Sequence, residues 1–143
     1  MTPIKLKIDQ KNQLLWVLSA ATFLIFFQAF MVAPLIPRLA DVFQVSVETI
    51  GLIVPAYLVP YAIATLVYGP LSDRVGRMSI IFGSLFALIL FTILTAVAWS
   101  AMSMLSFRLL TGLGASGMVP IALALIGDLF PYNERGRALG WLF

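Results

Sequence analysis

The sequence predicts an all-α membrane protein with four transmembrane helices and the start of a fifth. Of its 143 residues, 62% are hydrophobic and only 10% are charged, and the mean hydropathy is +1.04. A soluble domain is roughly 45–50% apolar. The apolar residues also fall into four runs that reach the length of about 20 residues needed to cross a bilayer.

The first helix is expected at about 14–36, after an N-terminal segment of residues 1–13 outside the membrane. Its run is too long for a signal peptide and has no small-x-small cleavage site, so we expect the helix to be retained. Pro34 and Pro37 should kink or end it. Gln28 is its deepest polar residue.

The second and third helices are expected at about 50–68 and 78–99, separated by the polar residues 69–77. Gly69 and Pro70 can end a helix, and Gly76 adopts a positive φ without cost. This stretch also carries Asp73, Arg74 and Arg77. One carboxylate and two guanidinium groups so close together favour charge-assisted hydrogen bonds between two helix ends.

The fourth helix is expected at about 101–127, after a hairpin at Ser100, with a bend at Pro120. Residues 131–137 read as a second polar turn, and a fifth apolar run starts at 138. Because six residues cannot cross a bilayer, we expect the chain to be part of a longer protein.

Charge distribution predicts the orientation. The side that would be cytoplasmic carries seven of the basic residues, Lys5, Lys7, Lys11, Arg74, Arg77, Arg135 and Arg137, and the other side carries Arg38. Under the positive-inside rule, the N-terminus is cytoplasmic, and we expect the plasma membrane. The pI near 9.6 therefore reflects membrane topology, and no nucleic-acid partner is expected.

Arg108 is the most informative single residue, because it lies within the fourth apolar run. A charge there costs roughly 2.5–3.5 kcal/mol on the milder insertion scale. Two interpretations remain open: the side chain snorkels to the outer surface, or it faces a polar cavity or backbone carbonyls of neighbouring helices. Gly112 shares its face, whereas Gly114 and Gly117 lie towards another, so two neighbours can approach closely.

Tyr57 and Tyr61 form part of a polar-tipped stripe on the second helix. Such a stripe either packs against other helices or lines a polar pathway. The sequence likewise leaves open whether Gln28 faces a polar cavity. The sequence has no Cys and no His, so neither a metal site nor the usual catalytic constellations are expected, and we predict no enzyme.

Three segments carry a family resemblance. Gly69, Asp73, Arg74, Gly76 and Arg77 match, at the family's spacing, the loop after the second helix of the major facilitator superfamily. Met78 and Ser79 depart from it, where members often have a basic residue and a proline. Arg108, Gly112 and Gly114 resemble the fourth-helix motif, with Thr111 in place of a frequent Gln. Asp128, Pro131 and residues 134–137 resemble the loop before the fifth helix.

The resemblance implies an N-terminal part of the six-helix bundle of a secondary transporter, similar to the drug and sugar efflux (drug:proton antiporter) branch. It implies alternating access, with a small-molecule substrate near the bilayer midplane, and a chain that does not transport without the remainder of the protein. It allows proton coupling, which would need Arg108 or a residue beyond Phe143, because no Asp or Glu lies well inside the four spans. No cofactor is implied.

The resemblance also implies two groups of site residues. A cytoplasmic gating group contains Gly69, Asp73, Arg74, Gly76, Arg77, Asp128 and Arg135, and within it Asp73, Arg77 and Asp128 are expected to form a charge cluster. A pathway and coupling group contains Gln28, Tyr57, Tyr61, Arg108, Gly112 and Gly114.

Two alternatives remain. One is a small four-helix exporter acting as a dimer, although such proteins depend on an acidic residue in the first helix, where this chain offers Gln28. The other is a membrane protein, or remnant, that inserts without transporting.

Overall fold

The computed structural model describes residues 8–143 of the chain, and these are helical along most of their length. Lys5 and Lys7, which the orientation argument used, lie outside the described residues. In chain order the elements are α1 (Ile8–Phe30), the 3-10 helix η1 (Ala33–Leu35), α2 (Ile36–Phe43), α3 (Val47–Gly51), α4 (Ile53–Val75), α5 (Arg77–Ala96), α6 (Ala101–Ala115), α7 (Met118–Leu129) and α8 (Tyr132–Leu142).

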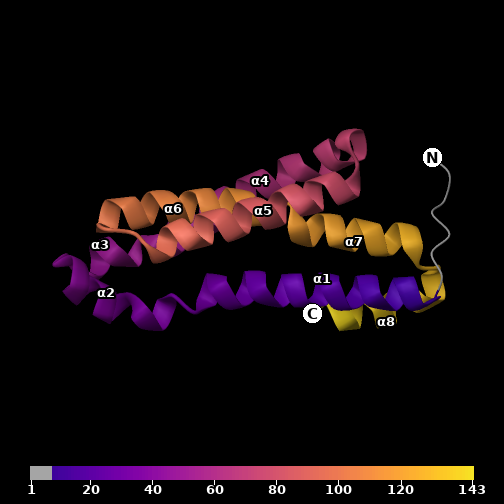
Figure 1. Ribbon diagram of the computed structural model, residues 1–143, viewed down its shortest axis with the longest axis horizontal. Coiled ribbons are helices and arrows are strands. Elements are labelled where there is room, and N and C mark those ends of the chain that lie inside the picture. The colour runs from indigo at the N-terminus through magenta and orange to yellow at the C-terminus, as the bar shows by residue number, and fades with distance from the viewer. Residues whose placement is uncertain (1–7) are drawn as a thin grey trace.

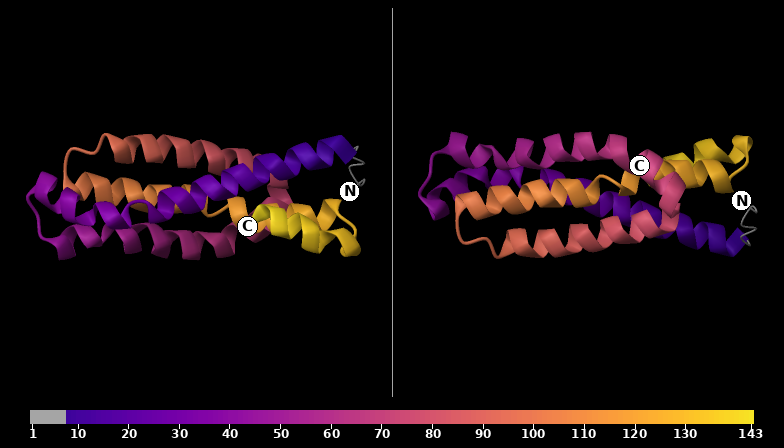
Figure 2. Two further views of the ribbon diagram at one scale, coloured as in Figure 1. Left: turned by 90° about the horizontal axis from the view of Figure 1, so that it is seen from below. Right: turned by 90° about the horizontal axis from the view of Figure 1, so that it is seen from above.

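The long helices lie side by side in an elongated bundle (Figure 1). One end holds α2, α3 and the connection from α5 to α6; towards the other lie the start of α1 and the junctions α4–α5 and α7–α8 (Figure 2). Four segments of the described chain are long and apolar enough to cross a membrane: Asp9–Phe43, Val47–Val75, Arg77–Ala96 and Ala101–Leu129. The predicted all-α class and the four spans are confirmed.

The proline pair after the first helix acts as expected, although the helix bounds differ from those predicted. The first helix starts at Ile8 and ends at Phe30; Pro34 then lies in η1 and Pro37 in the first turn of α2. A proline is tolerated in a first turn because its missing N–H has no partner inside the helix.

The second helix does not end at Gly69 and Pro70, so that prediction is wrong. α4 continues through both residues to Val75, and the break comes at Gly76, which has φ of 103°. Proline removes one backbone hydrogen bond, but its φ is compatible with a helix on its C-terminal side. Ser72 is buried there, and its hydroxyl donates to the Gly69 carbonyl at 2.7 Å. The turn to α5 is therefore a single glycine.

The polar residues 131–137 also differ from the prediction, because they are helical. Pro131 is the N-cap of α8, and Glu134 lies in the first turn, where a carboxylate interacts favourably with the helix dipole. The predicted turn is reduced to Phe130 and Pro131, and the fifth helix starts six residues earlier than expected, at Tyr132 instead of residue 138.

The fourth span is divided in two. α6 ends at Ala115 and α7 starts at Met118, after a turn at Ser116 and Gly117. Pro120 has no N–H to donate to the carbonyl four residues earlier, that of Ser116. The Thr65 hydroxyl on α4 approaches this oxygen at 3.4 Å. The bend expected at Pro120 thus lies one turn before it.

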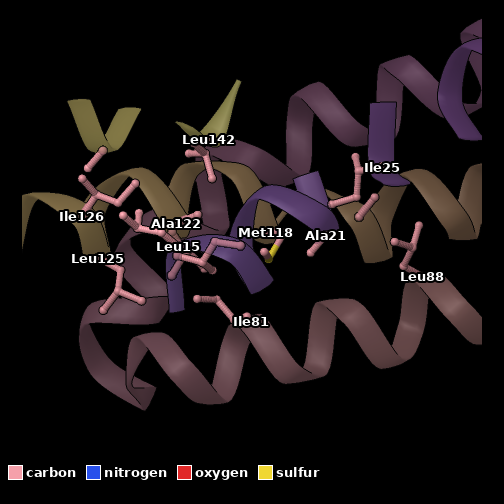
Figure 3. Packing of buried hydrophobic residues seen from close by; sticks show 14 of the residues in the cluster. Leu15, Ala21, Ile25, Ile81, Leu88, Met118, Ala122, Leu125, Ile126 and Leu142 are labelled. Carbon is pink, nitrogen blue, oxygen red and sulfur yellow. The ribbon is translucent and has the colours of Figure 1, made fainter. Parts of the chain in front are cut away.

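This fourth span is the centre of the bundle. Of its most apolar stretch 61% is buried, against 17% for α5. The main core lies where α7 packs between α1 and α5, and Figure 3 shows side chains from α1, α5, α7 and α8 converging there. Phe23, Leu66 and Phe86 are among many large apolar side chains left exposed, as expected of surfaces that face lipid or further helices.

Candidate functional site

Arg108 is buried at the contact between α6 and α1. Its side chain is 1% exposed. One terminal nitrogen donates to the Gln28 side-chain oxygen at 2.7 Å and to the Gln28 backbone carbonyl at 3.4 Å, and the other donates to the Ala29 carbonyl at 3.3 Å. Of the two interpretations left open by the sequence, the structure shows contact with backbone carbonyls of a neighbouring helix.

Tyr57 of α4 completes this cluster. The Arg108 guanidinium carbon lies 5.1 Å from the centre of the Tyr57 ring, a distance at which the ring face attracts a cation. Tyr57 is 2% exposed, whereas Gln28 and Tyr61 are half-buried. The Tyr57 and Tyr61 rings stack with 5.8 Å between their centres. The structure therefore brings Gln28, Tyr57, Tyr61 and Arg108 together.

Two glycines allow α6 to pack closely against two neighbouring helices, one of which is α4 of this cluster. A Cβ on Gly112 would overlap the Tyr57 carbonyl oxygen and would lie 3.0 Å from its carbonyl carbon. A Cβ on Gly114 would lie 2.8 Å from the Ala87 side chain on α5. Gly112 thus admits α4 and Gly114 admits α5, which confirms the prediction that small residues on two faces of the fourth helix admit two neighbours.

A second cluster lies at the Gly76 end of the bundle. Arg77, the first residue of α5, forms an ion pair with Asp128 of α7 at 2.7 Å and a longer one with Asp73 of α4 at 3.5 Å. The side chain of Arg77 is 26% exposed, and those of Asp73 and Asp128 are 67% and 53% exposed. Isolated exposed pairs contribute only about 0–1 kcal/mol, so these two ion pairs add little to the stability of the fold.

The same end of α7 makes two contacts that the sequence did not reveal. Lys11 of α1 donates to the Leu129 carbonyl at 2.8 Å and lies 5.2 Å from the centre of the Phe130 ring. Arg135 of α8 donates to the carbonyls of Gly127 and Phe130 at 2.7 and 3.0 Å. Cations at a helix C-terminus satisfy free carbonyls and oppose the dipole. The end of α7 is thus bonded to α1, α5 and α8.

The remaining predicted residues of the gating group lie apart from these contacts. Arg74 is exposed, and it makes no ion pair with any of the described carboxylates. Gly69 lies inside α4 with open space where a Cβ would be. Within residues 8–143, no group of three His, Cys, Asp or Glu side chains could hold a metal ion.

Comparisons with known proteins agree on one family. The model of the Major Facilitator Superfamily matches residues 18–143. The chain is 34% identical over 138 residues to the MFS transporter eqxG of Fusarium heterosporum, covering 96% of this chain and 29% of that protein. It is 34% identical over 126 residues to the uncharacterized MFS-type transporter YceJ of Bacillus subtilis, covering 88% of this chain and 32% of that protein. A Gibberella fujikuroi protein named trichosetin biosynthesis cluster MFS transporter is 30% identical over 138 residues, covering 96% of this chain and 29% of that protein.

Proposed function

Because this chain belongs to the major facilitator superfamily, we propose that it forms the first four helices, and part of the fifth, of a secondary active transporter. The transporter exports a small molecule, such as a drug or a sugar, by alternating access. This chain spans only 29–32% of the relatives eqxG and YceJ. It supplies one side of the substrate site, and the remainder of the transporter supplies the other.

The proposed location is the plasma membrane, with the Gly76 end of the bundle in the cytoplasm. Four basic residues lie in the first or last turn of a helix at that side: Lys11, Arg74, Arg77 and Arg135. Arg137 follows in the middle of α8, whereas Arg38 lies in α2 near the other end. The positive-inside rule then gives α1 a cytoplasmic start.

The ion pair between Arg77 and Asp128 carries the proposal, because it joins the α4–α5 junction to α7 through charged groups that are partly exposed to water. We assign the gating group of Gly69, Asp73, Arg74, Gly76, Arg77, Asp128 and Arg135 to this junction. The cluster of Asp73, Arg77 and Asp128 holds the cytoplasmic side closed in the outward-facing state and separates in the inward-facing state. The half-exposed carboxylates permit this, since water can solvate them when the pair is broken.

The pathway and coupling group consists of Gln28, Tyr57, Tyr61, Arg108, Gly112 and Gly114. A buried arginine in a membrane protein is costly and marks a functional site by default. Here it lies at the junction of α1, α4 and α6, with the two half-buried side chains of Gln28 and Tyr61 beside it. Gly112 lets α6 approach α4 closely enough to form the cluster, and Gly114 lets α6 approach α5.

Replacing Asp128 with Asn in the full-length transporter tests the gate. The change removes the charge and keeps the size, so we expect insertion to be unchanged and flux into proteoliposomes to fall at least tenfold. Glu134→Gln is the control, because Glu134 is an exposed carboxylate at the same end and forms no ion pair with any described residue. Wild-type flux in Asp128→Asn rejects the gate.

A further inference from the structure

Arg108 carries a buried positive charge that the described part of the chain does not neutralise. Neither of the ion pairs found among residues 8–143 involves Arg108. Its partners are an amide oxygen, two backbone carbonyls and an aromatic face, all of them electrically neutral. A buried charge is stable when it is paired and fully hydrogen-bonded. The surroundings of Arg108 meet only part of that requirement.

Three buried polar atoms of this one cluster also have no hydrogen-bond partner: Arg108 Nε, Gln28 Nε2 and the Tyr57 hydroxyl. All three donate a proton, and two of them cannot accept one. The orientation of the Gln28 amide follows from Arg108, because a guanidinium has only donors and the amide must present its oxygen to it. The Tyr57 hydroxyl oxygen can accept from only one of the two Gln28 amide N–H groups, so at least one N–H is left for another acceptor.

The contacts that Arg108 does make include two that are easily exchanged. Its bonds to the Gln28 and Ala29 carbonyls are 3.4 and 3.3 Å long, whereas charge-assisted N–H···O bonds ordinarily measure about 2.7–2.9 Å. An incoming anion can replace them at small cost and gain a pair of parallel bonds from the planar guanidinium. Gln28 and Tyr61 are the half-buried members of the cluster, so the approach lies on their side.

We propose that the cluster of Arg108, Gln28 and Tyr57 binds an oxyanion of the substrate, such as a carboxylate. This inference rests on the proposed transport function and names its substrate class: an organic acid in its charged form. A surplus of donors around an unpaired cation selects an acceptor with negative charge. It also disfavours ammonium groups, because bringing one beside Arg108 adds like-charge repulsion in a region of low dielectric.

Three probes of one shape test the proposal: 2-naphthoate, 2-naphthamide and 2-naphthylmethylammonium. Their binding to the purified full-length transporter in lipid nanodiscs is measured by calorimetry. We expect the acid to bind at least tenfold more tightly than the amide, and the amine to bind most weakly. Equal affinities for acid and amide overturn the proposal.

Substitutions test whether the preference for the acid depends on the cluster of Arg108, Gln28 and Tyr57. Arg108→Gln should remove the preference for the acid, whereas Arg38→Gln, which removes a charge from the exposed face of α2, should leave it intact. Tyr57→Phe keeps the ring and removes the hydroxyl, so acid binding should weaken about threefold to tenfold; Tyr68→Phe on the same helix is its control. An acid preference that survives in Arg108→Gln contradicts the assignment.

Gln28→Glu tests the oxyanion site even if the Arg108→Gln variant does not fold. It places a carboxylate on the atom that already accepts from Arg108 at 2.7 Å, so it should occupy the site from within and abolish acid binding. The competing source of the anion is a carboxylate in the rest of the transporter. In that case the wild type shows no preference for the acid and Gln28→Glu changes nothing in binding, which overturns the proposal.

Counterflow of labelled 2-naphthoate in proteoliposomes separates this inference from the proposed function. Acid binding at Arg108 without any counterflow refutes transport and leaves the oxyanion site standing. Counterflow of 2-naphthamide as fast as that of the acid refutes the oxyanion site and leaves transport standing.

Discussion

Replacing Gly112 with Ala should destabilise the protein through a contact that cannot relax. The new methyl group would overlap the Tyr57 carbonyl oxygen and would lie 3.0 and 3.2 Å from the Tyr57 carbonyl carbon and Cα. All three atoms belong to the backbone of α4, so the two helices must separate. Overpacking typically costs 1–3 kcal/mol. Because backbone atoms cannot move aside as a flexible side chain can, we expect a cost near the upper end, about 3 kcal/mol. The better helix propensity of Ala returns about 1 kcal/mol.

The expected net loss is therefore about 2 kcal/mol, or roughly thirty-fold in the equilibrium between folded and unfolded protein. Gly83→Ala on α5 is the matched control, because a Cβ there meets nothing within 4 Å and only the propensity gain remains. Unfolding by SDS in mixed micelles, followed by tryptophan fluorescence, compares the two variants. If Gly112→Ala is as stable as Gly83→Ala, the close approach of α4 and α6 is refuted.

Two further substitutions test the contacts around α7, and a third, Thr92→Val on α5, is a control. Lys11→Met should cost about 1–2 kcal/mol in the same unfolding assay, because it removes the bond to the Leu129 carbonyl and the contact with Phe130; an unchanged midpoint would refute that cap. Thr65→Val should cost about 0.5–1 kcal/mol, because it removes a hydroxyl that donates to the Tyr61 carbonyl at 2.8 Å and also approaches the Ser116 carbonyl at 3.4 Å. Thr92→Val should be neutral or stabilising, since the Thr92 hydroxyl is buried with no partner. Equal effects of these two threonine changes would contradict the role given to Thr65.

Features that depend on a single helix could be predicted from the sequence. The four spans follow from apolar length, and the positive φ of Gly76 follows from the freedom of glycine. The two-sided packing of the fourth helix follows from the positions of Gly112 and Gly114, because residue spacing fixes the face on which a residue lies.

Features that depend on a neighbouring helix could not be predicted. The sequence predicted a helix end at Pro70, but α4 continues through it. Proline removes only one backbone hydrogen bond, and the sequence alone does not show whether the surrounding packing offsets that loss. Arg135 looked like a loop residue, yet its guanidinium caps α7 from within α8. Lys11 and Leu129 are 118 residues apart, and no local signal in the sequence relates them.

The most direct test of the proposed cytoplasmic gate, the pair of Arg77 and Asp128, is an exchange of the two charges. Flux is measured in proteoliposomes for the full-length transporter carrying Arg77→Asp, Asp128→Arg, or both changes, at equal amounts of inserted protein. Each single change leaves two like charges at a contact that now measures 2.7 Å. The double change restores the attractive pair, but it also places a carboxylate at position 77 next to Asp73, so recovery below the wild-type level is expected. We expect flux at least tenfold below wild type in both single variants and substantial recovery in the double variant. Single variants as active as wild type, or a double variant no better than either, would refute the gate.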